Sequence, residues 1–339
     1  MNKKIKYPEE ITKNKVIGVT ATSMGITDSY DIERLSKAYK YLEEKGYKII
    51  ETKNVRTNKH FVSSNGKTRA QEFMDLWSNN KIGWIAQASG GEFLMEMLPY
   101  INKEVIINNY PKWITGYSDC SLLNFYITTN YNIATMTTTN IGHYGMDIID
   151  ESMINQLNIL ENPSFSVQKS FKLYELKKLD KHKSYNLTEK VTYKHLYNKK
   201  HDKISGRLIG GCIDVLSELP GTTFDNTKNF CQEFPEGMLW YLENCEQSIL
   251  SLYRILWQMK NSGWFNNMNG IIIGRTRSKE TIADLSYEDI LHKVFDDMNI
   301  PVIYDVDFGH VMPQWTMING SYAEFNYDNG SGEIIEEFR

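Results

Sequence analysis

A serine in a predicted turn carries the sharpest chemical signal in this chain. Residues 116–119, G-Y-S-D, follow the strand candidate 112–115 and precede an apolar helix. A serine in a tight strand-to-helix turn has its hydroxyl held away from the sheet, and the amides at the helix start point to where an oxyanion would form. Ser118 is therefore a candidate nucleophile, although the pattern is not G-x-S-x-G and the alternative is a helix N-cap.

A second turn, Ser89-Gly90-Gly91, follows the apolar residues 82–88. Glycine lets a backbone approach a ligand closely, so this turn is a candidate binding element; the alternative is a flexible strand-to-helix loop. Neither G-x-G-x-x-G nor G-x-x-x-x-G-K-[ST] occurs in the chain, so no nucleotide phosphate cradle is predicted.

The C-terminal part contains a histidine next to two carboxylates. His310 ends the segment D-V-D-F-G-H, in which Asp305 and Asp307 precede it. As a metal site this set needs further ligands, and of the other histidines only His143, with Asp147 four residues on, has a suggestive neighbour. As a general base, His310 needs a nucleophile to deprotonate and a carboxylate to orient its ring.

Glu243 offers such a carboxylate. It closes the apolar run 239–242, which has the composition of a buried strand. A carboxylate at a strand end can face a site, and the alternative is an ordinary surface glutamate.

The pattern around these residues predicts an α/β protein. In the first 140 residues, short apolar runs alternate with amphipathic stretches, which is typical of a parallel sheet. We predict strands at residues 16–20, 47–50, 82–88, 105–107 and 112–115, and helices at 29–45, 70–77, 92–100 and 122–126. Beyond residue 205 we predict strands at 206–211, 240–243, 270–273 and 302–304, with a helix around 252–259.

The length of 339 residues predicts two domains. We assign residues 1–165 to an N-terminal α/β domain that carries the nucleophile and residues 205–339 to a C-terminal domain that carries Glu243 and His310. Residues 166–204 are a lysine- and tyrosine-rich linker and loop. Between residues 169 and 203 there are eleven lysines and four acids, which indicates either a solvated linker or a substrate-facing loop.

The composition excludes several classes of protein. With 41% hydrophobic residues the chain is not disordered, and with a net charge of −4 it has no whole-chain basic field for nucleic acid. The N-terminal residues lack a signal-peptide core, and no run of 18 apolar residues occurs, so we expect a cytoplasmic protein without membrane contact. The four cysteines form no C-x-x-C pair and are expected to be reduced and buried.

Taken together, the motifs resemble the LD-carboxypeptidase family, which also contains the microcin C self-immunity peptidases. The motifs that carry the resemblance are G-Y-S-D at 116–119, G-R-L-I-G-G at 206–211, L-E-N at 242–244 and D-V-D-F-G-H at 305–310. They occur in the family's order, and the similarity extends over residues 16–334.

The resemblance implies a serine peptidase with a Ser-Glu-His triad and an active site in the cleft between two domains. Ser118 matches the nucleophile, His310 the general base and Glu243 the orienting carboxylate, while the amides of Gly91 and Asp119 match the oxyanion hole. The implied fold is a flavodoxin-like N-terminal domain with a strand-rich C-terminal α/β domain. The family also implies a homodimer that needs no metal and no cofactor.

Two segments depart from the family pattern. Muropeptide-trimming members often have R-G-G-Y-G where this chain has S-G-G-E-F at 89–93, and immunity members tend to have an asparagine after the glycines. The immunity branch has an acidic residue after its I-x-G-K segment, whereas this chain has I-G-R-T-R at 273–277. These departures leave the triad intact and concern the substrate.

Three functions are consistent with these residues. The first is hydrolysis of an amide bond in a peptidyl- or aminoacyl-nucleotide, which is an antibiotic self-immunity activity. The second is removal of terminal D-alanine from cytoplasmic muropeptides. The third, of another class, is a catalytically silent protein that binds a peptide or nucleotide in its cleft. Chain length, the D-V-D-F-G-H turn and the tyrosines of the 169–203 segment favour the first.

Overall fold

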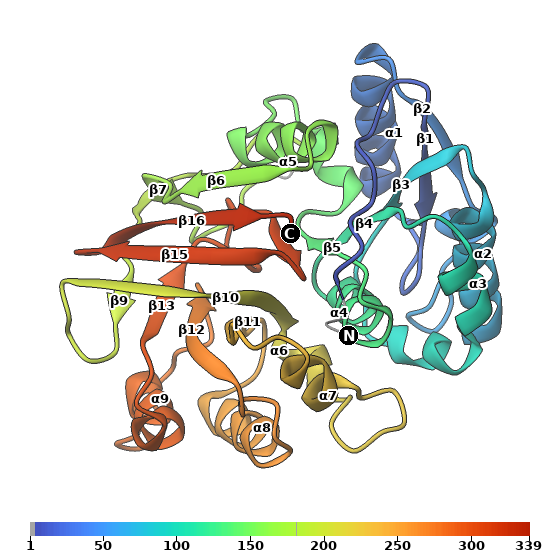
Figure 1. The fold of residues 1–339 in the computed structure, drawn as a ribbon. Coiled ribbons are helices and arrows are strands. Elements are labelled where there is room, and N and C mark those ends of the chain that lie inside the picture. Colours follow the sequence, from blue (N-terminus) through green and yellow to red (C-terminus); the bar gives the residue numbers. More distant parts are fainter. Residues whose placement is uncertain (1–3, 181) are drawn as a thin grey trace.

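The computed structural model describes residues 4–180 and 182–339, which form two α/β halves around two large sheets. Figure 1 shows the N-terminal half in blue and cyan and the C-terminal half in yellow to red, with the green segment that contains α5 (Glu151–Glu161) at the top of the view. Within the described residues, no helix has the length and apolar character needed to cross a membrane.

The N-terminal half is a doubly wound sheet. Its five parallel strands have the order β2-β1-β3-β4-β5, with β14 (Met317–Asn319) added antiparallel at the β5 edge. This is the flavodoxin-like strand order, in which ligands bind beyond the carboxyl ends of the strands. The strands and helices of this half are β1 (Val16–Thr20), α1 (Ser29–Glu44), β2 (Lys48–Glu51), α2 (Gly66–Ser78), β3 (Ile82–Gln87), α3 (Lys103–Asn108), β4 (Trp113–Gly116), α4 (Cys120–Tyr131), β5 (Thr135–Thr137) and α5 (Glu151–Glu161).

Local sequence signals explain these helices. The Asp28 side chain caps α1 by accepting the Tyr30 N–H at 3.0 Å, and Gly46 follows the helix with a φ of 91°. The face with Leu35 and Leu42 is buried against the sheet, as the 3.6-residue periodicity predicts.

Two predicted elements in this half are wrong in type. Residues 105–107 belong to helix α3 and not to a strand, because Asn102 caps the Glu104 N–H at 2.9 Å and a short apolar run fits either element. The predicted helix at 92–100 is a 3₁₀ segment, η2 (Leu94–Tyr100), which contains Pro99. Three further 3₁₀ segments are η1 (Lys53–Arg56), η3 (Ile141–Gly145) and η4 (Asp296–Met298).

The C-terminal half is a mixed sheet of eight strands in the order β6-β16-β15-β10-β11-β12-β13-β9. Strands β10 to β13 are parallel, and β6, β16 and β15 add an antiparallel part beside β10. The strands of this sheet are β6 (Phe165–Lys169), β9 (Lys194–His195), β10 (His201–Cys212), β11 (Met238–Glu243), β12 (Met268–Gly274), β13 (Val302–Val306), β15 (Tyr322–Asp328) and β16 (Ser331–Glu337), and β7 (Leu173–Tyr174) and β8 (Glu189–Lys190) form a separate pair. The helices are α6 (Ile213–Leu216), α7 (Thr227–Gln232), α8 (Ile249–Asn261) and α9 (Tyr287–Phe295).

The two halves share a core, and the C-terminal part of the chain contributes a strand to the N-terminal sheet. Phe125 of α4 stacks on Trp264 of the C-terminal half, with ring centroids 5.2 Å apart. Strand β14 comes from the C-terminal part of the chain but pairs with β5, with Met317 opposite Thr137. These contacts position the carboxyl end of β4 relative to the carboxyl end of β11. The predicted α/β fold with a strand-rich C-terminal half is confirmed.

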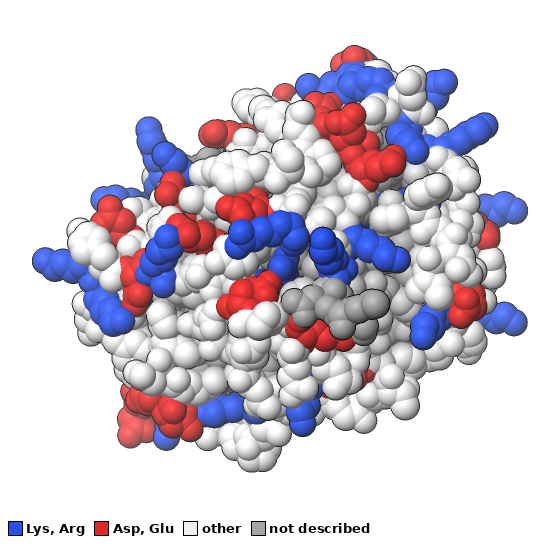
Figure 2. Space-filling view, in the orientation of Figure 1, with Lys and Arg blue, Asp and Glu red and all other residues white. Residues whose placement is uncertain are grey.

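The surface carries both signs of charge. On the face shown in Figure 2, Lys and Arg side chains are interspersed with Asp and Glu side chains, in keeping with the small net charge of −4.

Candidate active site

Ser118 lies in the turn between β4 and α4, as the sequence predicts. Its backbone has a φ of 62°, in the left-handed region that non-glycine residues seldom adopt. The turn needs a glycine at position 116, because a Cβ there would lie 2.6 Å from Gln87 Cγ and 2.9 Å from Cys120 Cβ. The N-cap position of α4 belongs to Asp119, so Ser118 is not the helix cap that the sequence left as an alternative.

Glu243 and His310 meet at the carboxyl end of the C-terminal sheet. Glu243 is the last residue of β11 and His310 follows β13; His310 Nδ1 lies 2.9 Å from Glu243 Oε1 and 3.0 Å from Oε2. Two glycines make room for the glutamate. A Cβ at Gly309 would lie 2.8 Å from Glu243 Oε2, and one at Gly274 would lie 2.9 Å from Glu243 Cβ. Glu243 is only 3% exposed, so it is not a surface glutamate.

The carboxylate sets the charge state of His310. Burial opposes a charged imidazole, but the charge of Glu243 and hydrogen bonds with Cys245 and Glu243 outweigh it and hold the pKa of His310 well above its usual value. Glu243 therefore favours the protonated form of the His310 imidazole.

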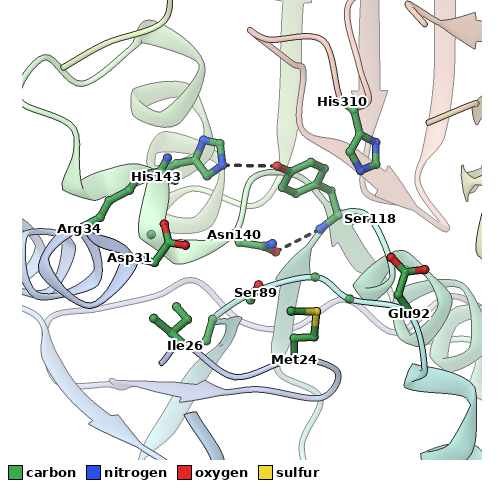
Figure 3. A pocket seen from close by; sticks show the side chains of 15 residues that line it. Met24, Ile26, Asp31, Arg34, Ser89, Glu92, Ser118, Asn140, His143 and His310 are labelled. Carbon is green, nitrogen blue, oxygen red and sulfur yellow. Dashed lines mark hydrogen bonds between the residues drawn. The ribbon is translucent and has the colours of Figure 1, made fainter. Parts of the chain in front are cut away.

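Ser118 and His310 line the same cavity, which has a volume of about 300 Å³. Figure 3 shows the two side chains on one side of this space, with Ser89, Met24 and Ile26 on another. The cavity lies beyond the carboxyl ends of β1, β3 and β4, where a doubly wound sheet binds its ligands. A hydroxyl and a carboxylate-bound imidazole at one cavity are the parts that nucleophilic catalysis requires.

The Gly90-Gly91 turn lies directly against the serine. A Cβ at Gly90 would lie 3.1 Å from Ser118 Oγ and 3.8 Å from the Asp119 nitrogen, and one at Gly91, whose φ is 151°, would overlap Ser23 Oγ. Position 91 therefore requires glycine, and a side chain at position 90 would crowd Ser118. The turn is packed against the serine, unlike the flexible loop that the sequence left as an alternative. The Asp119 carboxylate anchors the turn, because it accepts the Ser23 hydroxyl and the Leu94 N–H, the latter at 2.9 Å.

Arg69 is a supporting residue that the sequence reasoning missed. Its side chain is fully buried and donates to the carbonyl oxygens of Thr22 and Phe93, each at 2.9 Å, and to Glu96 at 2.6 Å. It thus joins the loop after β1 to the loop after β3. The signal was an arginine four residues before Phe73 on the apolar face of α2, where a solvated charge is not expected.

The carboxylates near His310 in sequence point elsewhere. Asp305 pairs with Lys279, and the buried Asp307 pairs with Arg275, so neither joins His310 in a metal set. The other suggested pair also separates. His143 contacts the Tyr185 hydroxyl at 2.8 Å, while Asp147 pairs with Lys37 at 3.2 Å.

The 169–203 segment reaches a second cavity of about 320 Å³ beside the first, and Arg34, Tyr117 and His143 line both. Tyr185 lines the second cavity, and its hydroxyl bonds to His143, whose other nitrogen lies 3.5 Å from the Tyr117 hydroxyl. The structure therefore places part of this segment at a cavity.

The basic residues that depart from the family pattern hold this segment in place. Arg275 is buried, pairs with Asp307 and lies 4.6 Å from the centre of the Tyr174 ring. Arg277 donates to the carbonyl oxygens of Leu176 and Glu175, each at 2.9 Å. Their side chains are thus used in packing the segment.

Comparison with known proteins shows that the chain is a serine-type carboxypeptidase. Residues 17–138 match the LD-carboxypeptidase N-terminal domain and residues 205–325 match the LD-carboxypeptidase C-terminal domain, which together cover more than half of the chain. The chain belongs to the LD-carboxypeptidase family.

Several relatives match over nearly the whole length. The Microcin C7 self-immunity protein MccF of Escherichia coli is 27% identical over 90% of this chain and 89% of its own. The probable murein peptide carboxypeptidase of Bacillus subtilis is 22% identical over 94% of this chain and 91% of its own. The structure of MccF in complex with glutamyl sulfamoyl guanosine matches with a TM-score of 0.82 and 23% identity, covering 98% of this chain and 99% of that one.

Proposed function

We propose that this protein hydrolyses an amide bond through an acyl-enzyme on Ser118, with His310 as general base and acid and Glu243 as the carboxylate that orients it. One observation carries the proposal: His310 Nδ1 is held by both Glu243 oxygens, at 2.9 and 3.0 Å, beside the cavity that Ser118 lines. With Nδ1 engaged, Nε2 is the nitrogen that can accept the Ser118 proton.

The reaction then follows the two halves of acyl transfer. His310 takes the hydroxyl proton as Ser118 Oγ attacks the carbonyl carbon, and it returns that proton to the leaving amine as the amide bond breaks. Water repeats the sequence on the ester and releases the acid. The Gly91 and Asp119 amides are the proposed oxyanion donors, and the fit of Gly90 against Ser118 and Asp119 supports this assignment.

For the substrate we propose a peptidyl- or aminoacyl-nucleotide. The MccF relative has been solved with glutamyl sulfamoyl guanosine and with aspartyl sulfamoyl adenosine. In this chain the second cavity supports a similar ligand, because Tyr185 can stack on a base and Lys178 can meet a phosphate at its edge. The acyl group would then lie at Ser118 and the nucleoside toward the 169–203 segment.

Mass spectrometry of two parallel incubations tests the substrate. The purified protein is given an aminoacyl-sulfamoyl adenosine or a muropeptide tetrapeptide, with Ser118→Ala as the matched control. We expect release of the free amino acid from the first substrate only, and none from the variant. Release of D-alanine from the tetrapeptide alone would overturn the nucleotide assignment and leave the serine mechanism standing.

Muropeptide trimming is the second candidate, and the match to the Bacillus subtilis relative over 94% of this chain favours it. A catalytically silent binding protein is the third. Labelling with a fluorophosphonate probe separates the enzyme from the binder: we expect labelling of the wild-type protein and none of Ser118→Ala. An unlabelled protein that binds the nucleotide tightly and turns over neither substrate would be the binder.

The family resemblance also leads us to propose a homodimer in the cytoplasm. Light scattering coupled to gel filtration tests the oligomeric state, and a mass of 39.4 kDa would identify a monomer. Fractionation of the source cells tests the compartment.

A further inference from the structure

Three side chains of different chemistry lie together at the carboxyl end of the C-terminal sheet. Cys212, Glu243 and His310 each offer a potential metal ligand atom, and these atoms all lie within 4.8 Å of one another. In residues 4–180 and 182–339 no other group of three or more His, Cys, Asp or Glu side chains has this arrangement. Among the described residues, such a cluster therefore occurs only at this end of the C-terminal sheet.

The fold builds the cluster from paired strand ends. Cys212 ends β10 and Glu243 ends β11, and the two residues are partners in the parallel register. Both are buried, with exposures of 2% and 3%, and His310 covers them from the turn after β13. The Cys212 thiol donates to Asp214 at 3.4 Å, a weak hydrogen bond that a metal–thiolate bond can replace.

The donor set suits a thiophilic cation. Thiolate, imidazole and carboxylate are the protein ligands of zinc, with bond lengths of about 2.3 Å to sulfur and about 2.0 to 2.2 Å to nitrogen or oxygen. Atoms within 4.8 Å of one another can approach one such ion with small side-chain shifts. His310 also lines the cavity, which gives the ion a path from solvent and leaves room for a water as the fourth ligand.

We propose that Cys212, Glu243 and His310 form an inhibitory site for a thiophilic divalent cation, of which zinc fits best. Binding replaces the thiol proton of Cys212 and the proton on the coordinating nitrogen of His310, and both protons go to solvent. No bond to substrate is made or broken, and the metal is not part of the reaction.

Occupancy blocks the proposed mechanism whichever ring nitrogen coordinates. If Nδ1 binds the ion, the neutral ring carries its proton on Nε2 and cannot accept one from Ser118. If Nε2 binds the ion, the acceptor itself is occupied. In both cases Glu243 is drawn into the metal site and no longer orients the imidazole. A chelator should therefore raise or leave unchanged the activity, and never abolish it.

A zinc titration of chelator-treated protein tests the site. Hydrolysis is measured for the wild type, for Cys212→Ser and for Cys231→Ser, each relative to its own metal-free rate. Cys231 is the matched control, because it is an equally buried thiol, in α7, that does not belong to the cluster. We expect micromolar zinc to inhibit the wild type and Cys231→Ser, and magnesium, which prefers oxygen ligands, to inhibit neither.

In Cys212→Ser the zinc concentration for half inhibition should rise by about tenfold or more, since even outer-shell partners of a metal contribute that much. Equal inhibition of wild type and Cys212→Ser would overturn the proposal, and so would the absence of inhibition.

A second measurement does not depend on turnover. Cobalt is added to Ser118→Ala, in which all three cluster residues are present, and a thiolate-to-cobalt charge-transfer band is expected in the near ultraviolet. The band should disappear in Ser118→Ala combined with Cys212→Ser. A cobalt band in Ser118→Ala together with a wild-type protein that hydrolyses neither substrate would support the metal site while refuting the proposed function. An active wild-type protein that zinc does not inhibit, with no band in Ser118→Ala, would refute the metal site and leave the proposed function standing.

Discussion

The Glu243→Gln substitution is the most direct test of the proposed triad. The variant keeps the size of the side chain and replaces a carboxylate oxygen by an amide that can also donate. Glu243 contacts His310 Nδ1 at 2.9 and 3.0 Å and is buried. Water therefore screens the attraction between the carboxylate and the imidazolium only weakly, and removing the charge of Glu243 should have a large effect. We expect the variant to fold and to lose most of its turnover.

The magnitude follows from the contact. Opposite charges about 4 Å apart at an effective dielectric constant of about 20 attract by about 4 kcal/mol, which is about 10³-fold in rate if it is lost from the transition state. An amide at this position also makes the wrong imidazole tautomer accessible, and in the serine proteases the corresponding asparagine variant loses about 10⁴-fold in kcat. We therefore expect kcat to fall by about 10³- to 10⁴-fold with KM little changed.

Steady-state kinetics across pH provide the assay. Because Glu243 raises the pKa of His310 and the general base must be deprotonated, kcat/KM of the wild type should increase as pH rises through that elevated pKa. In Glu243→Gln the pKa of His310 falls toward its ordinary value, so the residual activity should reach its plateau at lower pH. Glu243→Gln combined with Ser118→Ala should be no worse than Ser118→Ala alone, since the residues act as a unit.

Glu246→Gln is the matched control, because it makes the same change three residues on at an exposed position. It should leave kcat near the wild-type value. If Glu243→Gln raises KM and spares kcat, or if its pH profile is that of the wild type, Glu243 does not orient the base and the triad assignment is refuted.

Three further substitutions test the support of the site and the buried charge. Arg69→Met removes the donors to the carbonyl oxygens of Thr22 and Phe93. Because these two carbonyl groups lose a partner, we expect urea unfolding to give a free energy of unfolding lower by about 2 to 4 kcal/mol. The value of kcat/KM should also fall, and Arg69→Lys should restore part of it. Gly91→Ala places a methyl group against Ser23 and should lower kcat by about 10²- to 10³-fold, the usual effect of losing one oxyanion donor; an active variant would contradict that role. Burial raises the pKa of Glu336 to about 8, above its unfolded value, so its contribution to stability is present below about pH 4.3 and is lost as pH rises through about 8. Urea unfolding between those pH values should therefore show a decline that is smaller in Glu336→Gln than in the wild type, and a decline of equal size would refute the buried charge as its cause.

The sequence predicted the parts of the site that depend on local patterns. Ser118 was found because an apolar strand, a tight turn and a helix follow one another within a few residues, and the Gly90-Gly91 turn was found for the same reason. The structure adds that both turns lie at the carboxyl edge of one sheet and that their atoms touch. Parallel strands ending at one edge made this proximity a reasonable expectation.

What the sequence could not predict depends on side-chain direction and on distant pairing. Asp305 and Asp307 are as close to His310 in sequence as catalytic partners often are, yet they face Lys279 and Arg275. The spacing of residues in a turn does not determine where each side chain points. Strand β14 is only three residues long and pairs with a strand about 180 residues earlier, so no periodicity could have marked it.

One further residue, Ser121, links the turn of the serine to the sheet that carries its proposed base. Its hydroxyl donates to the Ser118 carbonyl at 2.7 Å and accepts the Cys212 N–H at 3.1 Å, so it joins the nucleophile turn to the end of β10. Gly211, with a φ of 155°, allows this approach, because a Cβ there would lie 3.1 Å from Ser121 Cβ. Since Cys212 is paired with Glu243 across β10 and β11, the chain of contacts runs from Ser118 to Glu243 and on to His310. Hydrogen bonds at the site itself thus position its two halves, in addition to the shared core. We therefore expect a substitution at Ser121 to lower the activity more than it lowers the stability of the fold.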